Sequence, residues 1–553
     1  MMRKIVWILG ILVIVVGIAW VNRIEILLQI PRVKAYFKEP IGPNREVVWD
    51  KGPLTASESP SQRKPNIIVI LADDLGFNDI SFYARDKSAA TLNTPHIDGL
   101  AEQGVFFTNA YASSPTCAPS RAAIMTGRYS TRFGYEFMAL PDSMGKMINL
   151  VARQHKNRLR YPIVHREAMD NIMNFDDMGM PPGEITIAEV LKASGYHTVH
   201  IGKWHLGRKG PLRPEAQGFD ESLIMDNLLY LPEDHPNVVN AKLDFDPIDR
   251  FLWGMGRFSA SFNGGERFEP GGYLTDYWTD EAVKVIEANK NRPFFLYLAH
   301  WGVHTPLQAT KADYDALGHI KDHKLRVYTA MIQALDRSVG RIMESLKQNG
   351  LEDNTMVIFT SDNGGPGYIG IPHINQPYRG WKLTMFEGGT HVPFFLKWPK
   401  QIASGSSYAK PISHMDIFAT AAGIAGAPLP ADRVIDGVNL VPYISGEKPG
   451  DPHEQLFWRQ GHYQAVLSNG WKLQVAQRPD KVWLFNLDED PTEQANLADK
   501  RPDKVEALKA LLVTHNADQA QPLWPSNFEG PVSIDKTLDR PESPDDEYVY
   551  WPN

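Results

Sequence analysis

Two pairs of oxygen-bearing side chains stand directly after two apolar segments of the sequence. Asp73 and Asp74 follow one such segment, and Asp362 and Asn363 follow another. Runs of apolar β-formers predict buried parallel strands, whose carboxyl ends meet at one edge of a sheet. Carboxylates and an amide are ligands that calcium and magnesium accept more readily than zinc does. We therefore expect one hard-cation site at this edge, with calcium as the first choice and magnesium as the second.

The single cysteine of the chain, Cys117, lies in the segment Ser-Pro-Thr-Cys-Ala-Pro-Ser-Arg-Ala-Ala-Ile-Met-Thr-Gly-Arg-Tyr that ends at Tyr129. A lone cysteine forms no internal disulfide and is usually a buried structural thiol. Here its surroundings argue otherwise. The Cys-x-Pro-x-Arg string followed by Thr-Gly-Arg resembles the mark of the formylglycine-dependent sulfatases, the arylsulfatase-like type I branch of the alkaline phosphatase superfamily. Further blocks resemble that family in its own order, at residues 66–76, 195–207, 359–365, 378–389 and 484–498.

The resemblance implies a chemistry for Cys117. A dedicated maturation enzyme would oxidise it to formylglycine (3-oxoalanine), whose hydrate attacks the sulfate ester and then expels sulfate with its second hydroxyl. Cys117 would also belong to the metal site. Cationic or proton-transferring groups must surround the sulfuryl group. By resemblance the catalytic residues are Cys117, Arg121, Lys203, His205, His304 and Lys382.

The spacing of these residues agrees with that assignment. Arg121 comes four residues after Cys117, which is about one turn of a helix and places both on one face. Lys203 and His205 alternate on a predicted strand and therefore project on one side. His304 follows another predicted buried strand closely.

An insertion at about residues 142–180 makes the chain longer between Cys117 and Lys203 than the family pattern leads us to expect. It is basic, and no acidic residue falls between Arg153 and Arg166. The ordinary interpretation is a solvated basic helix on the rim. The alternative hypothesis is that the insertion borders the pocket and binds further anionic groups of the substrate. The candidate substrate contacts are Arg158, Arg160, His165, Arg166 and, from another block, Trp381.

Strands and helices alternate through the larger part of the sequence. Buried strands are predicted within residues 66–74, 292–300 and 354–364, and helices at 186–194 and 328–348. This alternation predicts an α/β fold with a large mixed, mostly parallel sheet sandwiched by helices, as in alkaline phosphatase. Beyond about residue 440, a small antiparallel sheet with one helix is predicted from strands at 464–467, 471–475 and 482–487 and a helix at 503–514.

The N-terminus carries Arg3 and Lys4 and then an uninterrupted apolar run from Ile5 to Val21. As a helix the run spans about 25 Å, slightly less than a hydrocarbon core of about 30 Å. We favour an uncleaved signal anchor over a cleaved signal peptide; both send the rest of the chain out of the cytoplasm. The predicted location is the periplasm, anchored to the inner membrane, with secretion after cleavage as the alternative.

The predicted domain organisation follows from these features. The chain divides into a signal anchor or signal peptide (1–21), a tether (22–64), a catalytic domain (65–440), a small C-terminal subdomain (441–515) and a tail (516–553). The tail is either docked on the surface or disordered.

Charge and composition exclude some functions. The chain has 57 basic and 65 acidic residues, a net charge of -8, and no long basic run. Nucleic-acid binding is therefore not expected. A single calcium-type site favours sulfate esters, with phosphonate monoesters or phosphodiesters as the alternative substrates within the superfamily and a non-catalytic anion-binding protein as the third reading. Among sulfate esters, the sequence favours a sulfated carbohydrate, polymeric or small, and then an aryl sulfate.

Overall fold

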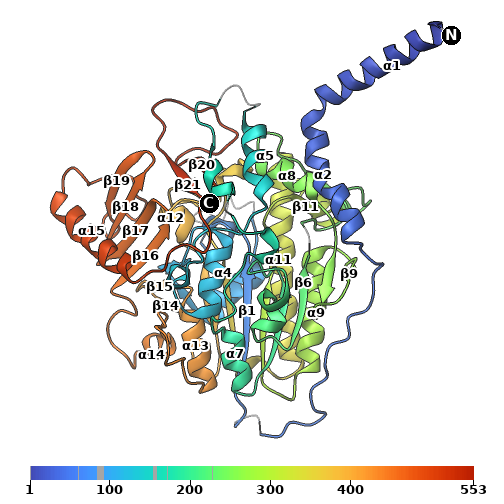
Figure 1. The fold of residues 1–553 in the computed structure, drawn as a ribbon. Helices are drawn as coiled ribbons and strands as arrows, with labels where there is room; N and C mark the ends of the chain where they lie inside the picture. The colour runs from blue at the N-terminus through green and yellow to red at the C-terminus, as the bar shows by residue number, and fades with distance from the viewer. Residues whose placement is uncertain (1, 60–61, 84–91, 154–157, 171, 227) are drawn as a thin grey trace.

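The centre of the computed structural model is a ten-stranded mixed sheet (Figure 1). The structure describes residues 2–59, 62–83, 92–153, 158–170, 172–226 and 228–553. The strands lie in the order β14 (Ser406–Tyr408), β2 (Val105–Phe107), β13 (Phe394–Lys397), β12 (Thr355–Ser361), β1 (Asn66–Ala72), β10 (Phe294–Ala299), β5 (His197–Gly202), β6 (Glu221–Met225), β8 (Ala260–Phe262) and β9 (Arg267–Phe268).

The middle of this sheet is parallel and completely buried. Strands β12, β1, β10, β5 and β6 pair in parallel, and β13 and β8 flank them in antiparallel orientation. Every residue of β1, β10 and β12 is buried, as their apolar sequences require of strands covered on both faces. The predicted fold class is confirmed.

Helices cover both faces of the sheet, and the alternation of side chains along β1 shows how. Ile68 and Ile70 pack in one core with α3 (Pro95–Gln103), α9 (Leu274–Ala288) and α11 (His323–Gln348). Ile67 and Val69 pack in a second core on the opposite face. The helices of this second face are α4 (Cys117–Thr126), α7 (Ile187–Ala193) and α13 (Asp416–Ala425).

Smaller elements complete this body. They are the paired strands β11 (Leu307–Thr310) with β7 (Val238–Ala241) and β15 (Ile412–Ser413) with β3 (Ala110–Tyr111), and the helices α8 (Pro247–Met255), α10 (Lys311–Ala316), α12 (Glu387–Thr390) and α14 (Val441–Ile444).

A small C-terminal unit packs at one side of the body (Figure 1). Its four strands form an antiparallel meander with α15 (Pro502–Ala517) against it. The strands are β16 (Gln455–Gln460), β17 (Tyr463–Ser468), β18 (Trp471–Gln477) and β19 (Asp480–Asn486). The predicted antiparallel sheet with one helix is confirmed, and β16 is a strand that the sequence analysis did not identify.

The last residues of the chain are ordered and join the insertion. Strands β20 (Phe528–Ser533) and β21 (Tyr548–Pro552) form an antiparallel pair, and β20 also pairs with β4 (Ile163–Val164). The insertion further contains α5 (Asp142–Ala152) and α6 (Arg166–Asp170); its residues 154–157 and 171 lie outside the described part of the chain. Of the two predicted states of the tail, docking on the body is the one observed.

The N-terminal segment begins with α1 (Met2–Val21), which projects from the body in Figure 1, and α2 (Arg23–Lys38), which packs on α8. Among the described residues, no helix combines the length and apolar character that crossing a membrane requires. The anchor therefore stays a prediction. Within the expected tether, Val47 and Trp49 are buried and the Trp49 indole donates to Glu281 over 2.7 Å, so this part of the segment is packed on the body.

Candidate active site

The predicted chemistry-bearing residues meet at the carboxyl ends of four neighbouring parallel strands. The four strands are neighbours in the order β12, β1, β10, β5. Asp362 and Asn363 come after β12, Asp73 and Asp74 after β1, His304 after β10, and Lys203 and His205 after β5. Ala72 pairs with Ser361 in register, so the two carboxylate pairs leave their strands at the same level. The carboxyl ends of parallel strands thus assemble the site, as in other α/β proteins.

The carboxylates form a buried cluster of oxygen ligands. Asp73, Asp74 and Asp362 are fully buried. Ligand atoms of Asp73, Asp74, Cys117 and His304 all lie within 4.8 Å of one another. The Asn363 amide nitrogen donates to Asp74 Oδ1 over 2.8 Å, and Asn363 Oδ1 is buried without a partner among the described residues. An orphaned buried acceptor is costly unless something binds it. These oxygen donors fit a hard cation such as calcium.

Cys117 is the first residue of α4 and points at this cluster. Its Sγ lies 3.6 Å from Asp73 Oδ1 and 3.8 Å from Asp74 Oδ1. The side chain is 1% exposed. Burial, and then the charge of Asp362, raises the pKa of the Cys117 thiol well above its ordinary value. The unmodified side chain is therefore a poor thiolate nucleophile at neutral pH.

Arg121 lies one turn further along α4 and is completely buried. It donates through Nε to Asp362 over 2.9 Å and through Nη2 to Asp73 over 3.1 Å. Its third donor, Nη1, reaches the carbonyl of Lys203 at 2.9 Å. The guanidinium thus joins three strand ends. The spacing argument that placed Cys117 and Arg121 on one helix face agrees with these contacts.

Lys203 and His205 follow β5, which ends at Gly202. The expectation that they alternate on the strand is wrong, because the backbone leaves the strand first and His205 adopts a φ of 63°. Lys203 Nζ nevertheless lies 2.5 Å from Asp73 Oδ2. Burial and the nearby Lys203 and Arg121 charges lower the pKa of His205 well below its ordinary value. Its buried Nδ1 has no partner in the described part of the chain.

His304 and Lys382 approach the other carboxylate, Asp74. His304 Nε2 lies 3.5 Å from Asp74 Oδ2, and the imidazole stacks on Trp301 at 4.0 Å between ring centroids. Lys382 Nζ lies 2.6 Å from Asp74 Oδ1 and 3.1 Å from Cys117 Sγ. Although burial opposes the shift, Lys382, His304 and Lys203 hold the pKa of Asp74 below its ordinary value.

Tyr368 belongs to the same cluster and was missed by the sequence analysis. Its hydroxyl donates to Asp74 Oδ2 over 3.0 Å. It follows Gly367 in a short 3-10 turn, Gly367–Ile369, and no spacing rule connects it to the strand ends. Its loop is held close to the Lys382 loop, since the Lys382 amide donates to the carbonyl of Gly365 over 3.1 Å. The contact between these loops is what brings Tyr368 to Asp74.

A cavity of about 480 Å³ opens beside Lys382. Tyr368, Trp381 and Lys382 line one side of it. Arg158, from the insertion, lines another side. Of the predicted substrate contacts, the structure therefore brings Arg158 and Trp381 to the catalytic pocket.

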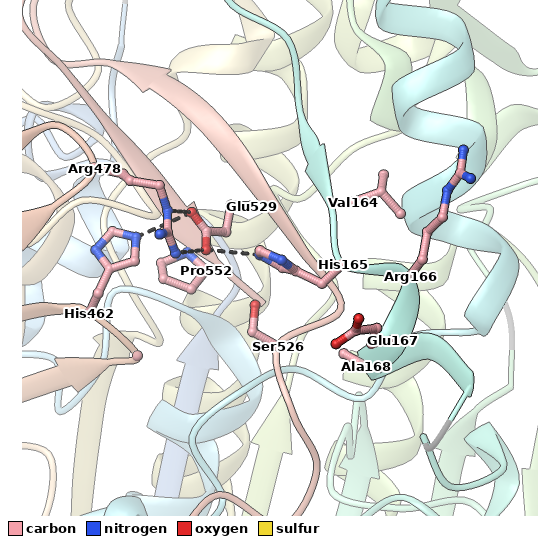
Figure 2. A pocket seen from close by; sticks show the side chains of 11 residues that line it. Val164, His165, Arg166, Glu167, Ala168, His462, Arg478, Ser526, Glu529 and Pro552 are labelled. Atoms are coloured by element: carbon pink, nitrogen blue, oxygen red, sulfur yellow. Dashed lines mark hydrogen bonds and ion pairs between the residues drawn. The ribbon is translucent and has the colours of Figure 1, made fainter.

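The other three predicted contacts lie elsewhere. Arg160 is engaged by the C-terminal segment, where its guanidinium lies 4.0 Å from the centroid of the Tyr548 ring. His165 and Arg166 line a second pocket, shown in Figure 2. There His165 points to the buried carboxylate of Glu529, at 2.9 Å, and Arg166 points away from it (Figure 2). Arg160, His165 and Arg166 flank the strand β4 (Ile163–Val164) and do not line the cavity beside Lys382, which the sequence did not reveal.

Comparisons with known proteins agree with this geometry. The Sulfatase family profile matches residues 65–427, and the profile "N-sulphoglucosamine sulphohydrolase, C-terminal" matches residues 379–518. The chain is 32% identical over 474 residues to steryl-sulfatase of Mus musculus, covering 74% of this chain and 70% of the relative. It is 33% identical over 426 residues to N-acetylgalactosamine-6-sulfatase of Mus musculus, covering 75% and 72%.

A solved structure extends the similarity to the fold. The crystal structure of Ps i-CgsB in complex with k-i-k-neocarrahexaose has a TM-score of 0.68 at 31% identity and covers 84% of this chain and 95% of that one. The chain therefore belongs to the sulfatase family, of type I, and has its alkaline-phosphatase-like fold. It is a sulfuric ester hydrolase, and the family resemblance drawn from the sequence motifs is confirmed.

Proposed function

We propose that this enzyme hydrolyses sulfate esters with a formylglycine formed from Cys117 and with one bound calcium ion. The observation that carries the proposal is the position of Cys117 Sγ, within 3.8 Å of two buried carboxylates and 3.1 Å from Lys382 Nζ. A nucleophile placed there attacks a group whose oxygens face cations on several sides. Hydrated formylglycine would supply one hydroxyl for the attack and a second one to expel sulfate. Bound calcium would supply a charge that lowers the pKa of the attacking hydroxyl and polarises the ester.

The metal ligands in this proposal are Asp73, Asp74, residue 117, Asp362 and Asn363. Three of these are carboxylates, opposed by the permanent charges of Arg121, Lys203 and Lys382. A divalent cation added to this balanced set leaves a net positive charge, which an anionic sulfate ester offsets.

The remaining side chains act on protons and on developing charge. Arg121 and Lys203 stabilise negative charge on the sulfuryl oxygens. His304 and Lys382, on the Asp74 side, assist the departure of the alcohol. His205, whose Nδ1 is free of partners in the described chain, takes the proton of the second hydroxyl when sulfate leaves.

The substrate of the proposal is a sulfated carbohydrate, with an aryl sulfate as the second choice. Support comes from aromatic side chains beside Lys382, chiefly Trp381 and Tyr368, which present faces to a sugar ring. The names of two relatives, N-acetylgalactosamine-6-sulfatase and the Ps i-CgsB complex with an oligosaccharide, point the same way.

The proposal includes a location and a partner. The apolar run after Arg3 and Lys4 supports export to the periplasm, by an anchor or a signal peptide. A formylglycine-generating enzyme must act on Cys117 before the chain has folded around it, because the folded side chain is 1% exposed. Fractionation of cells expressing the full chain, with a variant lacking residues 2–21 as the control, tests the location.

The decisive experiment measures free sulfate released by the chain co-expressed with a maturation enzyme. Substrates are sulfated polysaccharides, sulfated monosaccharides, an aryl sulfate and a phosphonate monoester. We expect Cys117→Ala to reduce sulfate release by about 10⁴-fold or more, and mass spectrometry to show formylglycine at residue 117 of the active protein. Full activity in Cys117→Ala contradicts the nucleophile, and faster turnover of the phosphonate ester contradicts the substrate class.

A metal test stands beside it. Calorimetry measures the binding of calcium that is titrated into chelator-treated protein. We expect one binding site per chain, and we expect Asp74→Asn to weaken the binding at least about tenfold. Zinc binding in preference to calcium contradicts the assignment.

A further inference from the structure

The catalytic pocket is closed by two parts of the chain that are far apart in sequence. Lys382 and Tyr368 form the side near Cys117. The insertion contributes Arg158, and the C-terminal segment contributes Leu538 and Trp551. At about 480 Å³ the cavity is in the size range of small-molecule sites. Because Lys382 stands at the leaving-group side in the proposed reaction, this cavity is where the alcohol portion of the ester lies.

Arg158 is the unusual residue of this cavity. Among the described residues, its guanidinium makes one hydrogen bond, from Nη2 to the carbonyl of Phe245 at 2.9 Å. No carboxylate of the described residues lies within 4.0 Å of it. Burial lowers the pKa of Arg158, and the charges of Glu542 and Asp246 offset this effect only in part. A largely buried arginine without an ion pair is costly, and proteins retain such groups where a ligand pairs with them.

The two nearest carboxylates are occupied by other partners. Asp246 caps α8, accepting from the amides of Ile248 and Asp249 at 2.9 and 3.1 Å. Glu542 accepts from the amides of Leu159 and Arg160 at 2.8 and 3.0 Å. Either carboxylate would give up these hydrogen bonds if it turned to Arg158. Arg158, Asp246 and Glu542 all line the cavity, and Arg158 forms no ion pair with either carboxylate.

Arg160 shows the contrast two residues further on. Its Nη1 lies 3.6 Å from Glu542, and its Nη2 donates to the carbonyls of Ser543 and Pro544, each at 3.3 Å. These contacts tie the insertion to the C-terminal segment. Arg160 thus joins the two segments that line the cavity, the insertion and the C-terminal segment, whereas Arg158 keeps N–H donors that no described residue accepts from.

We propose that Arg158 binds a second oxyanion, a carboxylate or a sulfate, carried by the alcohol portion of the substrate. This inference rests on the proposed function and narrows it: the substrate is the sulfate ester of a ring that bears another acidic group. The walls suit such a ring, since Phe245, Trp381 and Trp551 present aromatic surface to the same cavity. The guanidinium fork matches either oxyanion with two parallel hydrogen bonds.

Two matched substrate pairs test the proposal. The carbohydrate pair is N-acetylglucosamine 6-O-sulfate and D-glucosamine-2-N,6-O-disulfate; the aryl pair is 4-acetylphenyl sulfate and 4-carboxyphenyl sulfate. For each pair kcat/KM is measured in the wild type, in Arg158→Met and in Arg158→Lys. We expect Arg158→Met to lower the dianion-to-monoanion ratio of kcat/KM about 10- to 100-fold, the loss of a charge-assisted pair, mainly through KM. Arg158→Lys is expected to lie between.

The two pairs show whether the second oxyanion is a sulfate or a carboxylate. If Arg158 binds a sulfate, Arg158→Met changes the ratio of the carbohydrate pair more. If it binds a carboxylate, the substitution changes the ratio of the aryl pair more. Arg153→Ala is the matched control: Arg153 is an exposed arginine of the same insertion that donates to Asn149 over 3.0 Å, and the ratio should stay at the wild-type value. Unchanged ratios for both pairs in Arg158→Met, with wild-type turnover intact, overturn the inference. Absence of sulfate release by the wild type from every substrate instead contradicts the proposed function.

Binding affinity tests the same proposal without turnover. In the Cys117→Ala background, calorimetry should show the disulfated sugar binding more tightly than the monosulfated one, and the added Arg158→Met change should abolish the difference. Equal affinities before that change also overturn the inference.

Discussion

The strand-end cluster contains the fully buried Arg121, and the pocket wall contains the partly buried Arg158. The two arginines differ in their ion pairing. Arg121 in the cluster meets Asp73 at 3.1 Å and Asp362 at 2.8 Å. Arg158 in the wall meets one backbone carbonyl and no carboxylate within 4.0 Å among the described residues. The first arginine is part of a balanced charge network that holds the catalytic framework together. The second has no ion pair among the described residues, and in our proposal it pairs with an oxyanion of the substrate.

The comparison distinguishes the side chains that hold the strand ends together from the side chains that line the cavity beside Lys382. The cluster takes its side chains from strand ends that the sheet places side by side, and its charges are mutually compensated. The wall takes its side chains from an insertion and a C-terminal segment joined through β4 and β20. Among the described residues, the wall contains a positive charge without an ion pair, at Arg158, whereas the positive charges of the cluster are paired.

The largest expected effect comes from Arg121→Met. Asp73 and Asp362 would remain buried without their counter-charge, so the free energy of unfolding should fall by about 3–5 kcal/mol. Sulfate release should be lost as well. Urea unfolding followed by circular dichroism measures the first quantity.

Arg158→Met is the paired measurement. Because this change removes a buried charge that has no ion pair, the free energy of unfolding should change by less than about 1 kcal/mol. Comparable destabilisation by both substitutions would remove the distinction between the two arginines.

A smaller effect is expected from Tyr368→Phe. The change removes one hydrogen bond to Asp74 and keeps the ring that lines the pocket. We expect kcat to fall roughly 3- to 10-fold, with KM nearly kept, because Asp74 is less well oriented. A fall in kcat/KM that comes from KM alone would assign Tyr368 to the pocket wall instead of the cluster.

The smallest effect concerns Glu529, which lines the second pocket (Figure 2). Against the opposing effect of burial, hydrogen bonds from His462, Arg478 and His165 lower the pKa of Glu529 from 4.5 to about 2. A carboxyl group with a lowered pKa stabilises the fold above its unfolded pKa and loses that contribution as the pH falls toward its folded pKa.

Glu529→Gln should therefore destabilise the protein by about 1 kcal/mol at pH 7. The difference from the wild type should shrink as the pH falls from 4.5 toward about 2. Urea unfolding at a series of pH values measures it, and a difference independent of pH would show that the charge of Glu529 contributes nothing.

Much of the catalytic cluster could be predicted from residue order. Asp73-Asp74 and Asp362-Asn363 each follow a buried apolar run, and parallel strands must end at a common edge. Cys117 and Arg121 are one helical turn apart. These are local patterns, and the register of β1 with β12 converts them into contacts. The exit of Lys203 and His205 from β5 depended on a positive φ that the alternating pattern did not reveal.

The pocket wall could not be predicted in this way. Tyr368 reaches Asp74 through a loop contact, and the basic residues of the insertion point to different places: Arg158 to the catalytic cavity, Arg160 to the C-terminal segment, His165 to Glu529. Their sequence neighbourhood is nearly the same. What separates them is the pairing of β4 with β20, which joins residues more than three hundred positions apart.

The sequence by itself determined the family and the sheet with its carboxylate and amide side chains at the strand ends, because these depend on local hydrophobic patterns and short spacings. Only the tertiary structure decided which basic side chains have a carboxylate partner and which have none among the described residues. Ion pairing depends on distances between segments, and those distances are set by long-range strand pairing and by the packing of the C-terminal segment against the insertion.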